Sequence, residues 1–168
     1  MLFGDASSVA LEISLSATYR GWGRVFIWID GIRFGQDDFD EELDHFFHRA
    51  LKDVERNTAH FYVSKHVSGS DYKRLVDLAY DDEFDGAMLG IPEIGGGDFV
   101  ESTIIRWPYA FDRILLGCVP AESADHIVAF DDERKVSGSK MVDKGTLWSV
   151  LKMAGDWCLE HVPPSERL

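Results

Sequence analysis

The sequence contains few cysteines and no long hydrophobic run. Cys118 and Cys158 are its two cysteines, and both lie in apolar stretches, which predicts buried free thiols and no disulfide framework. No apolar stretch approaches the roughly 18 residues that a membrane-spanning helix needs. The N-terminus shows neither the basic region nor the apolar core of a secretory signal. We therefore expect a cytoplasmic protein that does not associate with a membrane.

Basic residues are scarce as well. The 168 residues include 17 Lys and Arg against 30 Asp and Glu, which gives a formal net charge of −13. An acidic surface repels phosphates, so nucleic-acid binding is disfavoured, and it attracts basic proteins. The charge is equally consistent with a role in solubility alone. Because 45% of the residues are hydrophobic, the chain can bury a sizeable core, and we expect residues 1–168 to form a single domain.

The sequence also lacks the common catalytic motifs. The glycines at positions 95–97 are not followed by the Lys-Ser/Thr pair of a phosphate-binding loop, and there is no CxxC, GxSxG or HExxH motif. Ser137 and Lys140 have the spacing of a Ser-x-x-Lys hydrolase, but they fall in an expected strand or turn, whereas that chemistry needs a helix. The sequence thus predicts a protein that is not an enzyme, with no catalytic residues, no cofactor and no metal.

Hydrophobic periodicity predicts an α+β fold. Apolar and polar residues alternate over residues 9–15, and β-branched and aromatic residues fill residues 24–29. Asp30-Gly31 is typical of a tight hairpin turn into residues 32–34, so the chain opens with a three-stranded antiparallel meander. Helical spacing predicts three helices, at residues 40–56, 71–80 and 146–161. Ser68-Gly69-Ser70 is expected to cap the second helix, and Pro163-Pro164 to end the third.

The middle of the chain has strand-like segments separated by turn residues. Further strands are expected at residues 60–65, 102–107, 111–119, 125–130 and 135–142, and a glycine-rich surface loop at residues 86–97. This order of elements is typical of an antiparallel sheet packed against about three helices, including a C-terminal helix.

Two acidic segments are the candidate binding surface. Between positions 37 and 56 the chain has eight acidic and three basic residues, and between 81 and 85 it has four acidic residues in five. If the two segments meet in space they form one strongly negative face, suited to a basic partner protein; otherwise each is a solvated helix face or loop. The candidate residues are Asp37, Asp38, Asp40, Glu41, Glu42, Asp44, Asp81, Asp82, Glu83 and Asp85.

Two histidines suggest an alternative reading. His45 and His48 are three residues apart on the first predicted helix, with Glu41 and Asp44 nearby. This spacing could place two imidazoles and a carboxylate around one metal ion. Because both histidines fall outside the apolar stripe and no partner motif is present, surface histidines on an acidic helix are the favoured interpretation. A small metal-binding protein or enzyme is kept as an alternative, as is a non-catalytic adaptor for another protein.

Several short motifs resemble family forty-two of the bacterial polymorphic-toxin immunity proteins. They are Met1-Leu2-Phe3-Gly4-Asp5 before the strand at residues 9–15, Gly23-x-Val25-x-Ile27, Ile29-Asp30-Gly31, Gly35, the helix beginning near Asp40, and Phe111-Asp112 before an apolar strand. The resemblance covers the first third of the chain well and the middle loosely. It implies a cytoplasmic inhibitor that binds a cognate secreted toxin domain, often a nuclease, and it supplies no catalytic residues.

Overall fold

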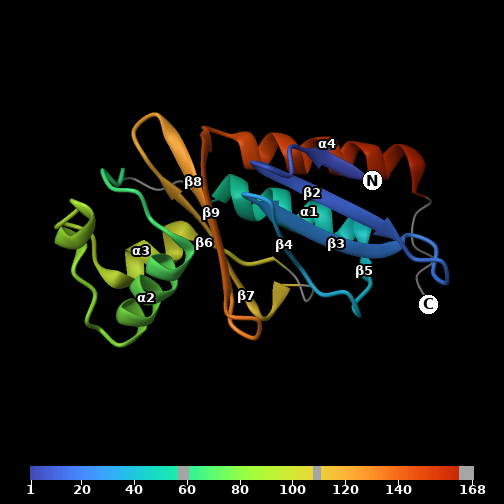
Figure 1. The fold of residues 1–168 in the computed structure, drawn as a ribbon. Coiled ribbons are helices and arrows are strands. Elements are labelled where there is room, and N and C mark those ends of the chain that lie inside the picture. Colours follow the sequence, from blue (N-terminus) through green and yellow to red (C-terminus); the bar gives the residue numbers. More distant parts are fainter. Residues whose placement is uncertain (57–60, 108–110, 163–168) are drawn as a thin grey trace.

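The described residues form an α+β fold of two antiparallel sheets and four α-helices, whose arrangement can be followed in Figure 1. It is described by a computed structural model that covers residues 1–56, 61–107 and 111–162. The α+β class, the opening meander and the C-terminal helix predicted from the sequence are all confirmed. No helix in these residues is long and apolar enough to cross a lipid bilayer.

The first sheet contains the predicted meander. Its strands run in the order β1 (Leu2–Gly4), β2 (Val9–Leu15), β3 (Trp22–Ile29) and β4 (Ile32–Phe34), and each pairs antiparallel with the next. Asp30 and Gly31 have φ angles of 53° and 79°, which are the positive values that a two-residue hairpin turn requires. The sequence did not predict β1, because three residues are too few to show a period.

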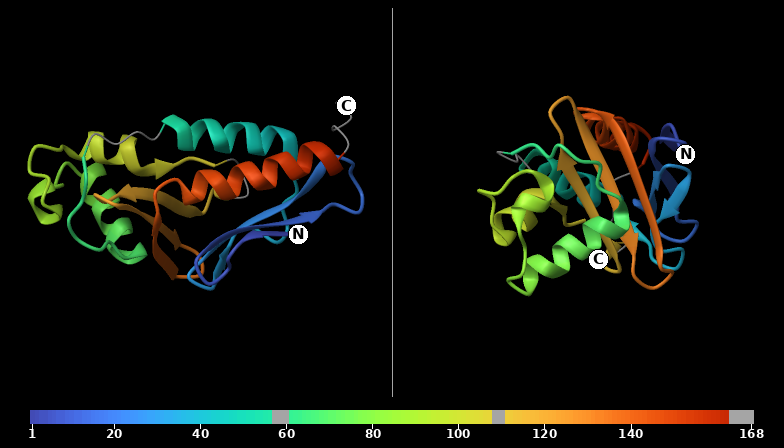
Figure 2. Two further views of the ribbon diagram at one scale, coloured as in Figure 1. Left: turned by 90° about the horizontal axis from the view of Figure 1, so that it is seen from above. Right: turned by 60° about the vertical axis from the view of Figure 1, so that its left-hand side comes forward.

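One face of the first sheet is packed against two helices. The odd-numbered residues of β2 and β3 point inward, so that Leu11, Val25 and Ile27 are buried in the main core. Helix α4 (Thr146–His161) lies along β1 and β2, and α1 (Leu43–Arg56) lies beside α4 (Figure 2). The bounds predicted for the C-terminal helix are confirmed, while Pro163 and Pro164 fall outside the described residues.

The second sheet lies between the main core and a smaller one. It is formed by β6 (Ile104–Ile105), β7 (Ile114–Pro120), β8 (Ala124–Asp131) and β9 (Val136–Asp143), all antiparallel. The last three correspond to predicted strands. The prediction of a strand at 102–107 is wrong in extent, because residues 102 and 103 end a helix. The predicted strand at 60–65 is also wrong: Val63 forms a single bridge to Ala121, and His60 lies outside the described residues.

The smaller core belongs to a lobe made of α2 (Gly69–Tyr80), a 3-10 helix η1 (Gly86–Leu89) and α3 (Gly96–Thr103). We call residues 69–103 the α2–α3 lobe. Ser68 caps α2 as expected, since its hydroxyl accepts from the Asp71 N–H at 3.1 Å. The surface loop predicted for residues 86–97 is wrong, because it contains η1 and the start of α3. Gly96 serves close packing, because a Cβ at this position would lie 2.9 Å from Cα of Ala79.

Contacts between residues far apart in the sequence connect the parts of the fold. Arg134, after β8, donates to the backbone oxygen of Arg33 on β4 at 2.8 Å and so joins the two sheets. Gly117 of β7 lies directly against the ring of Tyr72, which is fully buried under the lobe. Asp53, near the end of α1, accepts the backbone N–H of Arg106 at 2.6 Å. The chain therefore leaves the main body and returns to it at neighbouring points.

Candidate functional site

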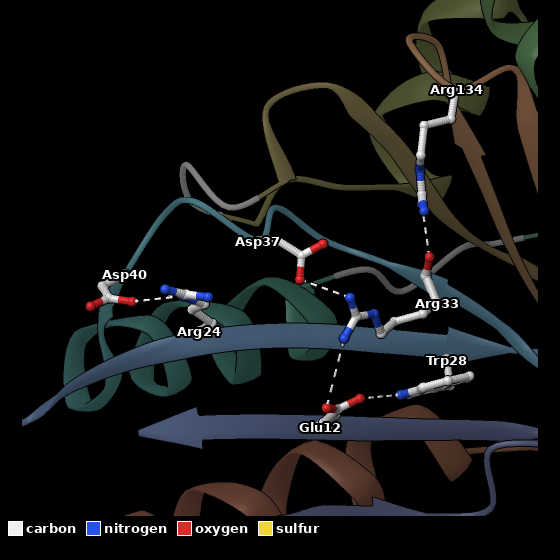
Figure 3. A network of polar contacts seen from close by, with 7 residues as sticks. All are labelled: Glu12, Arg24, Trp28, Arg33, Asp37, Asp40 and Arg134. Atoms are coloured by element: carbon white, nitrogen blue, oxygen red, sulfur yellow. Dashed lines mark hydrogen bonds and ion pairs between the residues drawn. The ribbon is translucent and has the colours of Figure 1, made fainter. Parts of the chain in front are cut away.

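The first acidic segment is largely tied to the first sheet. Asp37, Asp38 and Asp40 lie in the loop after β4. Asp37 accepts from the Arg33 guanidinium at 2.7 Å, and Asp40 accepts from Nε of Arg24 at 3.2 Å (Figure 3). Two of the three carboxylates are thus neutralised by arginines of the neighbouring strands. Asp38 is exposed and forms no ion pair within the described part of the chain.

The helix predicted from residue 40 begins instead at Leu43. Glu41 and Glu42 form a short strand, β5 (Glu41–Glu42), opposite Gly23 and Trp22 of β3. Glu41 is only 5% exposed and Glu42 is half-buried. Acidic residues ahead of an apolar stripe are typical of a helix N-terminus, but pairing with β3 overrides that local preference. Asp44 alone remains as an exposed acidic residue in the first turn of α1.

The outward face of the first sheet carries a polar network that the sequence did not predict. Trp28 donates from its indole N–H to Glu12 at 2.8 Å, and Glu12 also lies 3.9 Å from Arg33 (Figure 3). The guanidinium of Arg33 stacks over the ring of Phe26, 4.2 Å from its centroid. Strand alternation places these side chains on one face, but the pairing of Arg33 with Trp28 depends on the register between strands.

The second acidic segment joins α2 to η1 in the α2–α3 lobe. Asp81, Asp82, Glu83 and Asp85 are all exposed. Asp81 is the C-cap of α2, and Asp85 accepts the Ala87 N–H at 2.9 Å to cap η1. Among the described residues none of these four carboxylates forms an ion pair with a basic side chain. Their negative charge therefore faces solvent uncompensated.

The two acidic segments do not meet. Figure 1 shows the loop between β4 and β5 at the end of the first sheet, while the segment after α2 lies at the opposite end of the molecule. The single negative face that their union would have formed is therefore absent from the described structure. The hypothesis has to be divided into two separate surfaces, of which the lobe is the more acidic.

The α2–α3 lobe carries more than half of the net charge. Residues 69–103 include nine acidic and two basic residues, a formal charge of −7 out of −13. Of the two bases, Lys73 is bound to Asp77 of its own helix. Exposed apolar groups accompany the acids: Tyr80 is 67% exposed and Met88 39%. Such residues are typical of the anchors in protein interfaces.

The structure brings no metal ligands together around the histidines of α1. His45 and His48 are both exposed. Within residues 1–56, 61–107 and 111–162, no group of three or more His, Cys, Asp or Glu residues could hold a metal ion. Ser137 and Lys140 lie in strand β9, where Ser137 bonds to Ser70 and Lys140 pairs with Asp30. Neither arrangement offers a nucleophile next to a base.

A shallow hollow of about 730 Å³ lies between α2 and the ends of β7 and β8. Leu115 and Phe130 line it, and Lys73 and Arg113 stand at its rim. Both cations are already paired, with Asp77 and Glu133. The hollow therefore offers no uncompensated cation to an anionic ligand.

Comparison of the chain with protein-family models, curated proteins and solved structures found no match. The resemblance to the immunity family therefore stays a prediction from the N-terminal and central motifs of the sequence.

Proposed function

We propose that this chain is a non-enzymatic immunity protein that binds a cognate secreted toxin domain in the cytoplasm and covers its active site or substrate surface. The observation that carries the proposal is the α2–α3 lobe, with its charge of −7 and four unpaired, exposed carboxylates. A nuclease presents a basic surface to phosphates, and an acidic protein can occupy the same surface. The motifs that resemble the immunity family also support this proposal.

The lobe is favoured over the first acidic segment as the contact surface. Asp37 and Asp40 already bind arginines, and Glu41 is buried. If these carboxylates bound a partner protein, their ion pairs with the arginines would have to break, and contacts with the partner would have to offset that free energy. The carboxylates of the lobe bear no such cost. Tight inhibition requires a Kd of nanomolar or better, about −12 kcal/mol, and a total buried area of at least about 1,200 Å².

Co-expression tests the function itself. The tagged protein is expressed with the product of the open reading frame immediately upstream of its gene, and growth and complex formation are scored. We expect the upstream product to stop growth when expressed alone, and we expect the two proteins to co-purify with growth restored. A harmless upstream product that forms no complex would contradict the proposal and favour an adaptor for another protein.

Charge variants test the surface separately. In Asp82→Asn/Glu83→Gln both substitutions are nearly isosteric, and Asn tolerates the left-handed conformation of position 82, where φ is 57°. The matched control Asp143→Asn/Glu160→Gln removes two exposed carboxylates outside the lobe. We expect the lobe variant to associate with the toxin at least about threefold more slowly at low salt, with a weaker salt dependence. Equal association rates for both variants would exclude the lobe as the toxin-contact surface. They would not contradict the immunity function itself.

A further inference from the structure

His126 of β8 is a buried histidine at the contact between the second sheet and the segment that leads into the lobe. The residue is 1% exposed. Its Nδ1 accepts a hydrogen bond from the backbone N–H of Val67 at 3.4 Å. A ring nitrogen that accepts carries no proton, so the imidazole is in its neutral form with the hydrogen on Nε2. The contact seen in the structure therefore exists only while His126 is neutral.

Residues 61–68 join the lobe to the second sheet, and Phe61, Val63 and Val67 of this segment are buried in the smaller core. Val63 donates its backbone N–H to the oxygen of Pro120 at 2.9 Å, and Lys144 lies 4.2 Å above the ring of Tyr62. Val67, with the bond to His126, directly precedes Ser68, the cap of α2. Loss of the Val67 bond would thus act first on the start of α2.

Few charged groups surround His126. The ring of His66, on the same segment as Val67, lies 5.2 Å away between centroids. Asp125 precedes His126 on its own strand and accepts the Gly145 N–H at 2.9 Å. The strand neighbours Val119 and Met141 do not titrate. Burial lowers the pKa of His126 below its ordinary value of 6.5, His66 acts in the same direction, and Asp125 opposes them.

Two lysines near the segment face other groups. Lys65 donates to the backbone oxygen of Met88 at 3.0 Å, and Lys144 lies over Tyr62. On the lobe side, the first acidic residue of α2 is Asp71, which is bound to Ser68. The histidine pair and Asp125 are therefore the groups whose charges set the behaviour of His126.

We propose that the imidazole of His126 is an acid-sensitive latch that holds residues 61–68, and with them the start of α2, against the second sheet. Protonation places a hydrogen on Nδ1, so that two N–H groups face each other where one hydrogen bond stood. It also puts a positive charge in a buried site beside His66. The inference is independent of the proposed toxin partner, because it concerns only contacts within this chain.

The direction of the pH dependence follows from linkage. Once released, His126 is exposed to water and regains an ordinary pKa, which is higher than that in the latched state. The latch is fully stable above about pH 6.5 and weakens as the pH falls towards the lower pKa of the latched state. Each unit of difference between the two pKa values raises the population of the released state about tenfold.

Hydrogen exchange of the full-length protein between about pH 7.5 and pH 5, a range that brackets histidine titration, tests the latch. After correction for intrinsic exchange rates, we expect opening at the Val67 amide and in the first turn of α2 to increase as the pH falls through this range. The amides of β2 and β3 serve as the internal reference and should not change. Opening at Val67 that does not depend on pH would overturn the proposal.

Substitutions assign the effect to one ring. His126→Asn offers an amide oxygen near the position of Nδ1 and does not titrate, so the pH dependence at Val67 should disappear. His45 is exposed on α1, so His45→Asn is the matched control and should retain the pH dependence at Val67. His66→Gln should move the transition to higher pH, because a neighbouring positive charge is removed. Persistent pH dependence in folded His126→Asn would refute the latch.

If His126→Asn does not fold, a direct titration of the wild-type protein still tests whether protonation of His126 releases the segment. NMR of the wild-type protein follows the ring protons of His126 and the exchange of the Val67 amide in the same samples. We expect a common midpoint for both signals, and the same displacement of both midpoints in His66→Gln. Midpoints that differ between ring and amide would show that another group controls release.

Discussion

The close contact between Gly117 and Tyr72 predicts that one added methyl group at position 117 strongly lowers the stability of the protein. A Cβ at position 117 would lie 2.5 and 2.6 Å from Oη and Cε1 of Tyr72, and closer still to Cζ. The ring has no room to withdraw, because it is fully buried and its hydroxyl is hydrogen-bonded to Thr103 at 3.1 Å. Overpacking of this kind costs about 1–3 kcal/mol. We expect Gly117→Ala to lie at the upper end, about 3 kcal/mol.

Urea denaturation of a double-mutant cycle measures this contact. With a typical slope of about 2 kcal/mol per molar urea, Gly117→Ala should lower the unfolding midpoint by about 1.5 M. Tyr72→Leu removes the ring atoms that a Cβ would meet, at a cost of about 2 kcal/mol or more for the lost packing and hydrogen bond. In the Tyr72→Leu background, Gly117→Ala should lower the free energy of unfolding by less than about 0.5 kcal/mol. The coupling energy between the two substitutions is then about 2 kcal/mol or more. Equal costs in the two backgrounds would show that the clash is not with Tyr72.

Three further outcomes are expected. Ser68→Ala removes the cap of α2 and should lower the free energy of unfolding by about 1 kcal/mol in urea titration; no loss would mean that the cap is replaced by water. Burial disfavours the Asp131 carboxylate, but hydrogen bonds from Arg134 outweigh this effect and lower its pKa below 3.8. Asp131→Asn should lower the free energy of unfolding by about 2 kcal/mol at neutral pH, and this difference from wild type should narrow as the pH falls below 3.8. A difference that does not depend on pH would exclude the ionised pair. Desolvation raises the pKa of half-buried Cys118 to about 12 and that of buried Cys158 to about 11, so at pH 8 about a thousandth or less of either thiol is thiolate. A disulfide reagent should therefore label both thiols far more slowly in the native protein than in the unfolded protein, and equal labelling rates would contradict the raised pKa values.

The elements that could be predicted from the sequence are those with strong local signals. The meander has a two-residue period and an Asp30-Gly31 turn, α4 has an uninterrupted apolar stripe, and α2 has its Ser68 cap. The beginning of α1 was predicted too early, because Glu41 and Glu42 fit a helix N-terminus locally and only pairing with β3 makes them a strand. Helix α3 was missed because its glycines suggest a loop.

The candidate surface was predictable in composition but not in arrangement. The sequence shows which residues are acidic, but the pairing of Asp37 with Arg33 and the distance between the two acidic segments depend on the tertiary fold. The network of Trp28, Glu12 and Arg33 was missed for the same reason, since it joins three strands whose register no local pattern specifies.

The bond between Asp53 and Arg106 brings together the two points between which the chain forms the lobe. The chain departs from the body at α1 and resumes at β6, and one hydrogen bond of 2.6 Å joins the two points. Recombination at the two points could exchange one lobe for another of different charge while both termini and the first sheet stay in place. A replacement would need to cover the same side of the second sheet and present a flat ring to Gly117. If the lobe is the contact surface that we propose, such an exchange changes the charge of that surface and leaves the body that carries it intact.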